Sequence, residues 1–256
     1  MNIVVLIKFV PDLVEDLEID ATTGLLDRTF LRTIPNELDD HALEEAILLK
    51  ERHGGTVTVI TLDSGDVDET LFTAVAKGAD RVLKITGDGF DQGVSCQRLA
   101  AIFARAVAEL PHDLILTGTQ AVDDLDGFVG ALLAERLGLP YVGYVTKVVA
   151  GGGKLVARKE YPGGLTADIE VAGPAVLGIQ AAEKPPRYVV TSKVMEAMKS
   201  ARIDEAEAGD VAVDGELPVS AMAVPESSAR AEMITGSVAE VAEKLANLLR
   251  ERGVIA

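Results

Sequence analysis

The chain has 256 residues, of which 48% are hydrophobic, only 4% are aromatic and none is tryptophan. This length and composition allow one large α/β domain, or a domain with an arm, whose core is built from Val, Leu, Ile and Ala. The formal net charge of −17 disfavours binding to nucleic acid or anionic membranes, and favours solubility or protein partners with basic patches.

The start of the chain predicts a buried strand and no targeting signal. Residues 3–7 (IVVLI) form a short apolar run, without a basic region before it or a small-residue cleavage site after it. No later segment is apolar over a length that could span a bilayer. Cys96 is the only cysteine, so an intrachain disulfide is excluded and a reducing compartment fits. We expect a soluble protein without membrane insertion, and a cytoplasmic one if the source is bacterial.

Strand and helix patterns then alternate. Further buried strands are predicted at residues 56–62, 81–85 and 113–117. Asn36 is a predicted helix N-cap, and Gly78 is a predicted helix end. Asp66 and Glu69 resemble a capping box. Alternation at this spacing predicts an open, mostly parallel sheet with helices on both faces, in the flavodoxin-like layering of adenine-nucleotide-binding domains.

The pattern changes near Tyr141. Short alternating runs separated by glycine-containing breaks at residues 151–153 and 162–164 predict β-hairpins, and AVLGI at residues 175–179 predicts a buried strand. Residues 200–216 hold six acids and few large apolar groups, which predicts an extended linker rather than a core element.

A final amphipathic helix is predicted after that linker. Ser237 and Glu240 form a capping box, and Gly253 ends the pattern. Its apolar stripe must be buried on its own domain or on another chain. The expected organisation is therefore a nucleotide-binding domain with a hairpin insertion (residues 1–200), followed by a linker and a C-terminal helix (residues 201–256).

The loop GTQAVDDLDGFVG, residues 118–130, is the best candidate for a binding site. It follows a predicted strand and precedes a helical pattern, so a helix beginning near Gly127 would offer free N–H groups to phosphate. Asp126, as an N-cap, would compete for the same N–H groups. The three aspartates of this loop are unusual for a phosphate-binding loop. In addition, no lysine follows it as in a Walker A motif.

Catalytic motifs are absent from the sequence. There is no G-x-S-x-G, and no G-x-G-x-x-G follows the first strand. His41, His53 and His112 do not have metal-ligand spacing. We therefore predict no catalytic residue and no metal, and a binding or carrier subunit rather than a self-sufficient enzyme.

Seven stretches resemble, in order and spacing, the beta subunit of electron transfer flavoproteins. They are IKFVPD, NELDDHALEEAILLKE, ETLFTAVAKGADRV, GTQAVDD, PGGL, PRYV and ARAEMITGS. The resemblance implies a heterodimer with an alpha subunit that holds most of the FAD. It also implies that dehydrogenases, of the acyl-CoA or a related type, reduce this flavin, and that a quinone-linked or other acceptor drains it.

The resemblance further implies a pocket in the beta subunit for AMP or, in electron-bifurcating members that oxidise NADH, for a second FAD. The positions that it assigns to this pocket are Leu6, Asn36, Glu37, Leu38, Asp39, Leu62, Asp63, Gly118, Thr119, Gln120, Ala121, Val122, Asp123, Asp124, Leu125, Asp126, Gly127, Phe128 and Val129. Asp123 and Asp124 would lie near the ribose or adenine. Val129 replaces a threonine of AMP-binding members, and either resembles the bifurcating members or simply packs inward.

Two further positions follow from the same resemblance. Glu160 corresponds to a glutamate at the flavin interface, although a solvated hairpin carboxylate fits equally well. Residues 189–199 correspond to a loop that docks dehydrogenases, with Val190, Thr191, Val194 and Met195 as partner-docking residues. Thr191 stands where the family has a leucine anchor, so the dehydrogenase is expected to differ from the usual acyl-CoA type.

Two other classes of protein remain as alternatives. The first is a regulatory ATP- or AMP-binding protein of the stress-protein type, which the hairpins and the C-terminal helix disfavour. The second is a stand-alone nucleotide-dependent enzyme, which the missing lysine and histidine geometry disfavours.

Overall fold

A computed structural model of the chain describes residues 1–124, 128–151, 154–211, 213, 216, 219–225, 231 and 233–255. The chain divides into two compact units, Met1–Ala221 and Met222–Ala256. The first contains a large sheet with its helices, and the second contains the C-terminal helix.

The elements have the following bounds. The strands are β1 (Asn2–Ile7), β2 (Phe9–Pro11), β3 (Thr33–Pro35), β4 (Thr56–Leu62), β5 (Arg81–Thr86), β6 (Leu114–Gly118), β7 (Tyr141–Gly151), β8 (Lys154–Tyr161), β9 (Leu165–Val171), β10 (Ala175–Ile179) and β11 (Ile203–Glu207). The helices are α1 (Glu37–His53), α2 (Asp68–Lys77), the short 3₁₀ helix η1 (Phe90–Gln92), α3 (Cys96–Ala108), α4 (Val129–Leu137), α5 (Thr191–Ser200) and α6 (Val238–Glu251).

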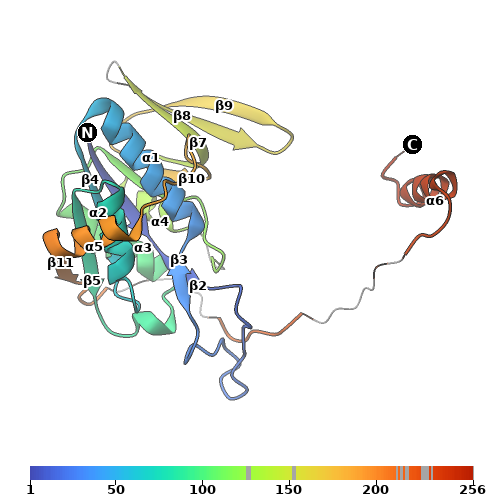
Figure 1. Cartoon of the computed structure of the whole chain (residues 1–256), viewed down its shortest axis with the longest axis horizontal. Helices are drawn as coiled ribbons and strands as arrows, with labels where there is room; N and C mark the ends of the chain where they lie inside the picture. The colour runs from blue at the N-terminus through green and yellow to red at the C-terminus, as the bar shows by residue number, and fades with distance from the viewer. Residues whose placement is uncertain are drawn as a thin grey trace. The chain divides into compact units, whose positions relative to one another are not determined.

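The main sheet is open and mostly parallel. Among the described residues it has nine strands in the order β11-β5-β4-β1-β6-β10-β7-β8-β9 (Figure 1). The strands from β11 to β7 pair in parallel, and β8 and β9 extend the sheet as antiparallel hairpins. A separate antiparallel ribbon joins β2 to β3. The predicted α/β class, parallel sheet and hairpins are confirmed.

The order of the strands defines a crevice. From β1 the chain first builds β4 and β5 on one side, and then crosses to the other side of β1 to build β6. In open α/β sheets, ligands bind outside the carboxyl ends of the strands at such a switch point. The segments that leave β1 and β6 at this edge begin at Lys8 and Thr119.

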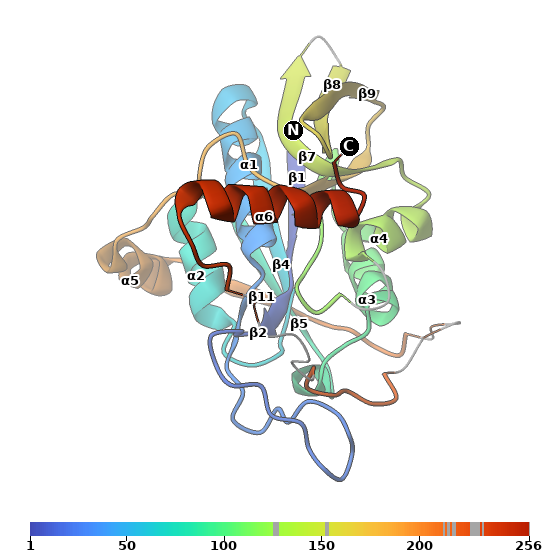
Figure 2. The ribbon, with the colours of Figure 1, turned by 90° about the vertical axis from the view of Figure 1, so that its right-hand side faces the viewer.

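Alternating side chains of the buried strands divide the core into two halves. On β1, Ile3, Val5 and Ile7 pack with α1 and α2. Val4 and Leu6 point to the other face and pack with α3 and α4. Figure 2 shows the sheet between these two pairs of helices. Strands buried on both faces explain why their sequences are continuous apolar runs.

Two local expectations differ from the structure. Residues 203–207, expected as part of a linker, form β11, which pairs in parallel with β5 at the edge of the sheet. Arg81 pairs with Asp204 at 2.7 Å, so the acids of this strand face partners as well as solvent. Asp66 and Glu69 do not form a capping box, because α2 begins at Asp68 after Val67.

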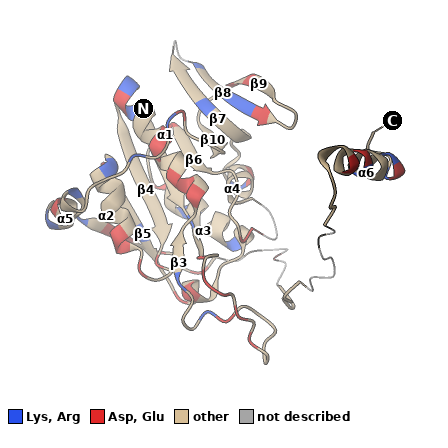
Figure 3. Ribbon diagram, turned by 45° about the vertical axis from the view of Figure 1, so that its right-hand side comes forward, with Lys and Arg blue, Asp and Glu red and all other residues tan. Residues whose placement is uncertain are grey.

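The second unit consists mainly of α6. Ser237 and Glu240 form the expected capping box, and no residue of this helix is buried. Figure 3 shows acidic residues on α6 as well as on α1 of the first unit. Among the described residues, no helix combines the length and apolar character that crossing a membrane requires.

Candidate functional site

The candidate site lies where β1, α1 and β6 meet at the switch point. Asn36 and Asp39 stand at the start of α1, and both are buried. The Asn36 side chain makes no capping hydrogen bond. Its Nδ2 donates to the carbonyl of Gln120, 3.2 Å away. Asn36 thus fixes the loop after β6 to α1.

Asp39 ties together the backbones of both neighbouring strands. Its Oδ2 accepts from the N–H of Lys8 at 2.8 Å, and its Oδ1 accepts from the N–H of Gly118 at 2.5 Å. Burial raises the pKa of Asp39 to about 7, although these hydrogen bonds act in the opposite direction. A Cβ at Gly118 would lie only 2.7 Å from Asp39 Oδ1 and from Leu38 Cβ, so this close approach requires glycine.

Lys8 explains the acidity of the loop. Its Nζ lies 2.7 Å from Asp123 Oδ1 and 2.7 Å from Asp124 Oδ1, and its side chain is largely buried. Burial alone would lower the pKa of Lys8, but the two carboxylates outweigh it and raise that pKa. The sequence analysis missed Lys8. The signal was a lysine directly after the first buried strand, at the edge where ligands bind.

Asp124 has further partners that hold the loop closed. Its Oδ2 accepts from the N–H of Ala121 at 2.7 Å, and its Oδ1 lies 3.1 Å from Cys96 Sγ at the start of α3. Cys96 is buried.

Two small pockets lie on either side of Lys8. One, of about 20 Å³, lies between Lys8 and the starts of α1 and α4, and its lining includes Asp39, Gly118 and Asp124. The other, of about 40 Å³, is lined in part by Lys8, Asp123 and residues of the β4 and α3 ends. A water needs roughly 10–15 Å³ of such volume, so neither pocket has room for a nucleotide while Lys8 and its two aspartates separate them.

The first pocket offers a polar group that the protein does not use. Thr117 is buried at the end of β6, and its Oγ1 has no hydrogen-bond partner among the described residues. Buried hydroxyls are normally satisfied, so this oxygen is a candidate contact for a bound molecule.

The remaining predicted pocket residues differ in their burial. Leu6 and Leu62 are buried in the core half that contains α3, Thr119 and Ala121 are buried in the loop, and Gln120 and Val122 are exposed. Glu37 is exposed and Asp63 is half-buried, with its Oδ2 3.9 Å from Lys84 Nζ. Leu125, Asp126 and Gly127 lie outside the described residues, so the predicted phosphate cradle at Gly127 stays a prediction.

Helix α4 begins two residues later than expected. Phe128 occupies the N-cap position in an extended conformation, and Val129 is the first helical residue. Val129 is half-buried against the core half that contains α3 and α4, and it also lines the first pocket. Of the two alternatives for Val129, inward packing is observed, and its contact with a nucleotide stays a prediction.

The other predicted site residues lie away from this pocket. Glu160 is exposed on β8, opposite Thr166 of β9. Val190 and Met195 are about half exposed, Thr191 is exposed at the start of α5, and Val194 is half-buried. Met198 of the same helix is 41% exposed. Residues 190–198 therefore present an exposed apolar surface.

A larger groove was not expected from the sequence. It has a volume of about 1080 Å³ and lies between α1, α2 and the β2–β3 ribbon, with Phe9, Ile34 and Leu43 among its apolar residues. Arg28 and Asp91 line both this groove and the pocket of about 40 Å³.

Among the described residues, histidine, cysteine and acidic side chains form no group of three or more that could hold a metal ion. His41 accepts a hydrogen bond at Nδ1 from the N–H of Ala182, and His112 contacts the carbonyl of Leu110.

Comparison with known proteins gives one consistent family. Residues 23–211 match the family model described as "Electron transfer flavoprotein domain". The chain is 34% identical over 263 residues to the electron transfer flavoprotein subunit beta of Thermoanaerobacterium thermosaccharolyticum, with the whole of both chains covered. It is 33% identical over 263 residues to that of Clostridium acetobutylicum, and 30% identical over 260 residues to that of Bacillus subtilis, again with both chains covered in full.

Proposed function

The chain belongs to the electron transfer flavoprotein family as a beta subunit, and from this premise we propose that it pairs with an alpha subunit to carry electrons from a dehydrogenase to a quinone-linked or other acceptor. FAD, held mainly by the alpha subunit, supplies the electron-accepting chemistry. The beta chain contributes a nucleotide pocket and two protein-binding surfaces. It is not itself an enzyme in this proposal.

The observation that carries the proposal is the polar crevice at the switch point. Lys8 provides a buried cation, Thr117 provides a buried hydroxyl without a partner among the described residues, and Gly118 lets the Asp39 and Asn36 side chains approach the end of β6 closely. These groups suit an adenine nucleotide, either AMP or a second FAD. Because the two pockets are small, binding requires the loop that carries Asp123 and Asp124 to move away from Lys8.

Two exposed apolar surfaces are available to bind the proposed partners. The apolar stripe of α6 has no buried residue, and an exposed stripe of this kind calls for a partner surface. We assign it to the alpha subunit, with the docking arm beginning after Ala221, where the first compact unit ends. We assign the exposed apolar surface around Val190 and Met195 to the dehydrogenase, and Glu160 to the flavin interface.

The test is to co-express the chain with its alpha subunit, record the visible spectrum and identify the released nucleotides by mass spectrometry. We expect one FAD per heterodimer plus one AMP or a second FAD, and little or no flavin on the beta chain alone. A colourless heterodimer would refute the proposal. A second FAD that NADH reduces would instead favour the bifurcating form.

A matched variant addresses the choice between the two nucleotides. Val129 lines the pocket at the first turn of α4. Val129→Thr adds a hydroxyl at almost constant volume, and should raise the ratio of AMP to FAD retained after dialysis. Val142→Thr, a buried change on β7 outside the pocket lining, is the control and should leave that ratio unchanged.

A further inference from the structure

A segment that we call the strap, residues 180–190, joins β10 to α5 and crosses α1 on the way. Three of its N–H groups donate to side chains of α1: Ala182 to His41 Nδ1 at 3.2 Å, Glu183 to Glu45 Oε2 at 2.9 Å and Arg187 to Glu44 Oε2 at 2.9 Å. Positions 41, 44 and 45 lie on one face of the helix. The strap is therefore bound along that face.

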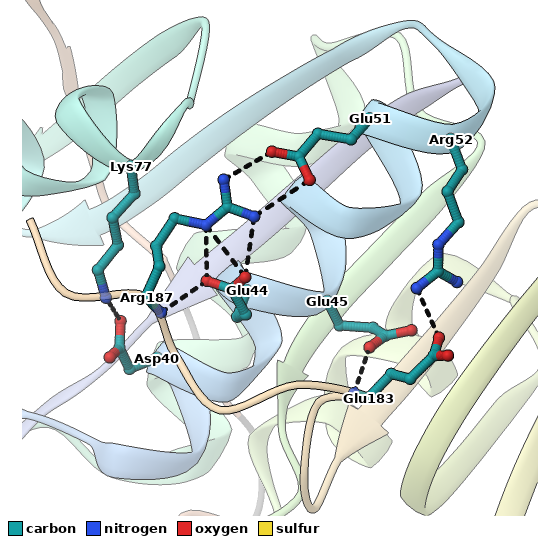
Figure 4. A network of polar contacts seen from close by, with 8 residues as sticks. All are labelled: Asp40, Glu44, Glu45, Glu51, Arg52, Lys77, Glu183 and Arg187. Atoms are coloured by element: carbon teal, nitrogen blue, oxygen red, sulfur yellow. Dashed lines mark hydrogen bonds and ion pairs between the residues drawn. The ribbon is translucent and has the colours of Figure 1, made fainter.

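Arg187 makes the strongest of these attachments. Its Nε and Nη2 donate to Glu44 at 3.0 and 2.9 Å, and its Nη1 and Nη2 donate to Glu51 at 2.6 and 3.2 Å. Glu44 and Glu51 are two helical turns apart, so one guanidinium spans both (Figure 4). The Glu44 side chain is only 3% exposed, which keeps water from competing for these charge-assisted hydrogen bonds.

A second ion pair fixes the other end of the strap. Glu183 accepts from Arg52 of α1 at 2.5 Å and lies 3.7 Å from Lys147 of β7. Figure 4 shows Glu183 and Arg187 bound on the same side of α1. The strap thus enters α5 from a fixed position.

Helix α5 itself is weakly packed. It lies beside α2, as Figure 2 shows, but Ala197 is its only buried residue. The exposed side chains at its start and along it include Tyr188, Val190, Met195 and Met198. After Ser200 the chain enters β11 and the edge of the sheet. The orientation of α5 therefore depends on its two ends, the strap before it and β11 after it.

We infer that Arg187 is a positioning residue for partner binding: by clamping the strap to Glu44 and Glu51, it holds the apolar surface of α5 in the orientation that a dehydrogenase recognises. This inference rests on the proposed docking of the dehydrogenase to α5. Because a surface that is already ordered loses less entropy on binding, the clamp increases affinity without contacting the partner.

The experiment uses the αβ heterodimer and a flavin-dependent dehydrogenase with its own substrate, chosen because it reduces the wild-type heterodimer, and measures the rate of flavin reduction against heterodimer concentration. Arg187→Gln removes the clamp. Met195→Asp tests the docking surface directly. Arg158→Gln is the matched control, since Arg158 makes a two-pronged pair with Asp168 on the exposed β8–β9 hairpin, at 2.8 and 2.9 Å.

We expect Arg187→Gln to raise the KM for the heterodimer about fivefold to tenfold with kcat within about twofold, because binding is weakened and the flavin is untouched. Amide hydrogen exchange should become faster in the strap and α5 and stay unchanged in the main sheet. Met195→Asp should raise the KM at least as much without faster exchange in the strap. Arg158→Gln should change neither quantity.

The outcomes separate the two proposals. If Met195→Asp raises the KM but Arg187→Gln does not, the clamp has no positioning role while the docking surface stands. If Met195→Asp leaves the KM unchanged, the docking proposal fails and the inference falls with it. If Arg187→Gln does not fold, Glu51→Gln keeps the Glu44 contact and should raise the KM about twofold to threefold; no rise would overturn the inference.

Discussion

The ammonium of Lys8 and the carboxylate of Asp124 lie 2.7 Å apart although 116 residues separate them along the chain. Lys8 leaves β1, and Asp124 lies in the loop after β6, so this pair joins the two strands at the switch point. Only 2% of the Asp124 side chain is exposed. The pair therefore stabilises the closed loop, and in doing so it keeps the crevice closed.

Removing the Lys8 charge should destabilise the fold. Lys8→Met keeps the length of the side chain but leaves the buried Asp124 and the partly buried Asp123 without their cation, and breaking such a pair costs about 3 kcal/mol of unfolding free energy. Chemical denaturation measures this loss. Lys50→Met removes a more exposed pair with Asp80, at 2.6 Å, and should cost less than about 1 kcal/mol. Equal losses in the two variants would contradict a special role for Lys8.

Gly118 should tolerate no side chain. The Cβ of Gly118→Ala would meet Asp39 Oδ1, Leu38 Cβ and Asn36 Nδ2 within 2.9 Å, and relieving such crowding costs about 1–3 kcal/mol. Gly151→Ala, where nothing lies within 4 Å, is the control and should be nearly neutral. Denaturation midpoints measure the stability of the two variants relative to wild type. A neutral Gly118→Ala would show that α1 can shift away from β6.

Asp39 should make the fold less stable as pH rises. Its pKa is about 7 in the folded chain, against an ordinary value of 3.8, so the folded state binds the proton more tightly than the unfolded state. The contribution of Asp39 is greatest below pH 4 and is lost between about pH 4 and 7, with a slope of at most about 1.4 kcal/mol per pH unit.

The measurement for Asp39 is unfolding free energy against pH for wild type and Asp39→Asn. The variant is expected to be less stable throughout, because its amide turns an N–H group toward one of the two backbone donors. The diagnostic quantity is the difference between the two proteins, which should shrink from pH 4 to pH 7. A difference that stays constant or grows over this range would mean that Asp39 is already ionised in the folded chain.

The apolar face of α6 should be needed for assembly with the alpha subunit. Leu245→Asp places a charge on the stripe that Val238, Val241 and Leu248 share, and should raise the Kd of the heterodimer roughly thirtyfold or more, equivalent to about 2 kcal/mol. Asn247→Asp adds the same charge on the opposite face, and should have little effect. Analytical ultracentrifugation of the mixed subunits gives both Kd values, and an unchanged Kd for Leu245→Asp would place the interface elsewhere.

The sheet was predictable because a strand that is buried on both faces has a continuous run of apolar residues in its sequence. The runs at Ile3–Ile7 and Ala175–Ile179 have no polar residue, and both are central strands. β11 has no such run. It is an edge strand of sequence IDEAE with most side chains in solvent, and its ladder with β5 depends on backbone groups that any residue possesses.

The site was predictable only in outline. The loop after β6 could be recognised because glycine and aspartates follow a buried strand. The partner of its aspartates could not, since Lys8 lies beside them only after β1 and β6 have paired. Likewise, Asn36 has the sequence of an N-cap, but the carbonyl of Gln120 captures its side chain. A local sequence pattern cannot predict a hydrogen-bond partner that is supplied by the loop after a distant strand.

The place of β11 in the sheet has a consequence for how the chain is made. β5 emerges from the ribosome more than a hundred residues before its outer neighbour, since Arg81 and Asp204 are 123 positions apart. Until then the outer edge of β5 has free N–H and C=O groups that any other strand can pair with. Synthesis at about 5–20 residues per second leaves that edge open for roughly 6–25 seconds, so the nascent chain is most prone to aggregate in this interval, before the strap and α5 deliver the strand that covers it.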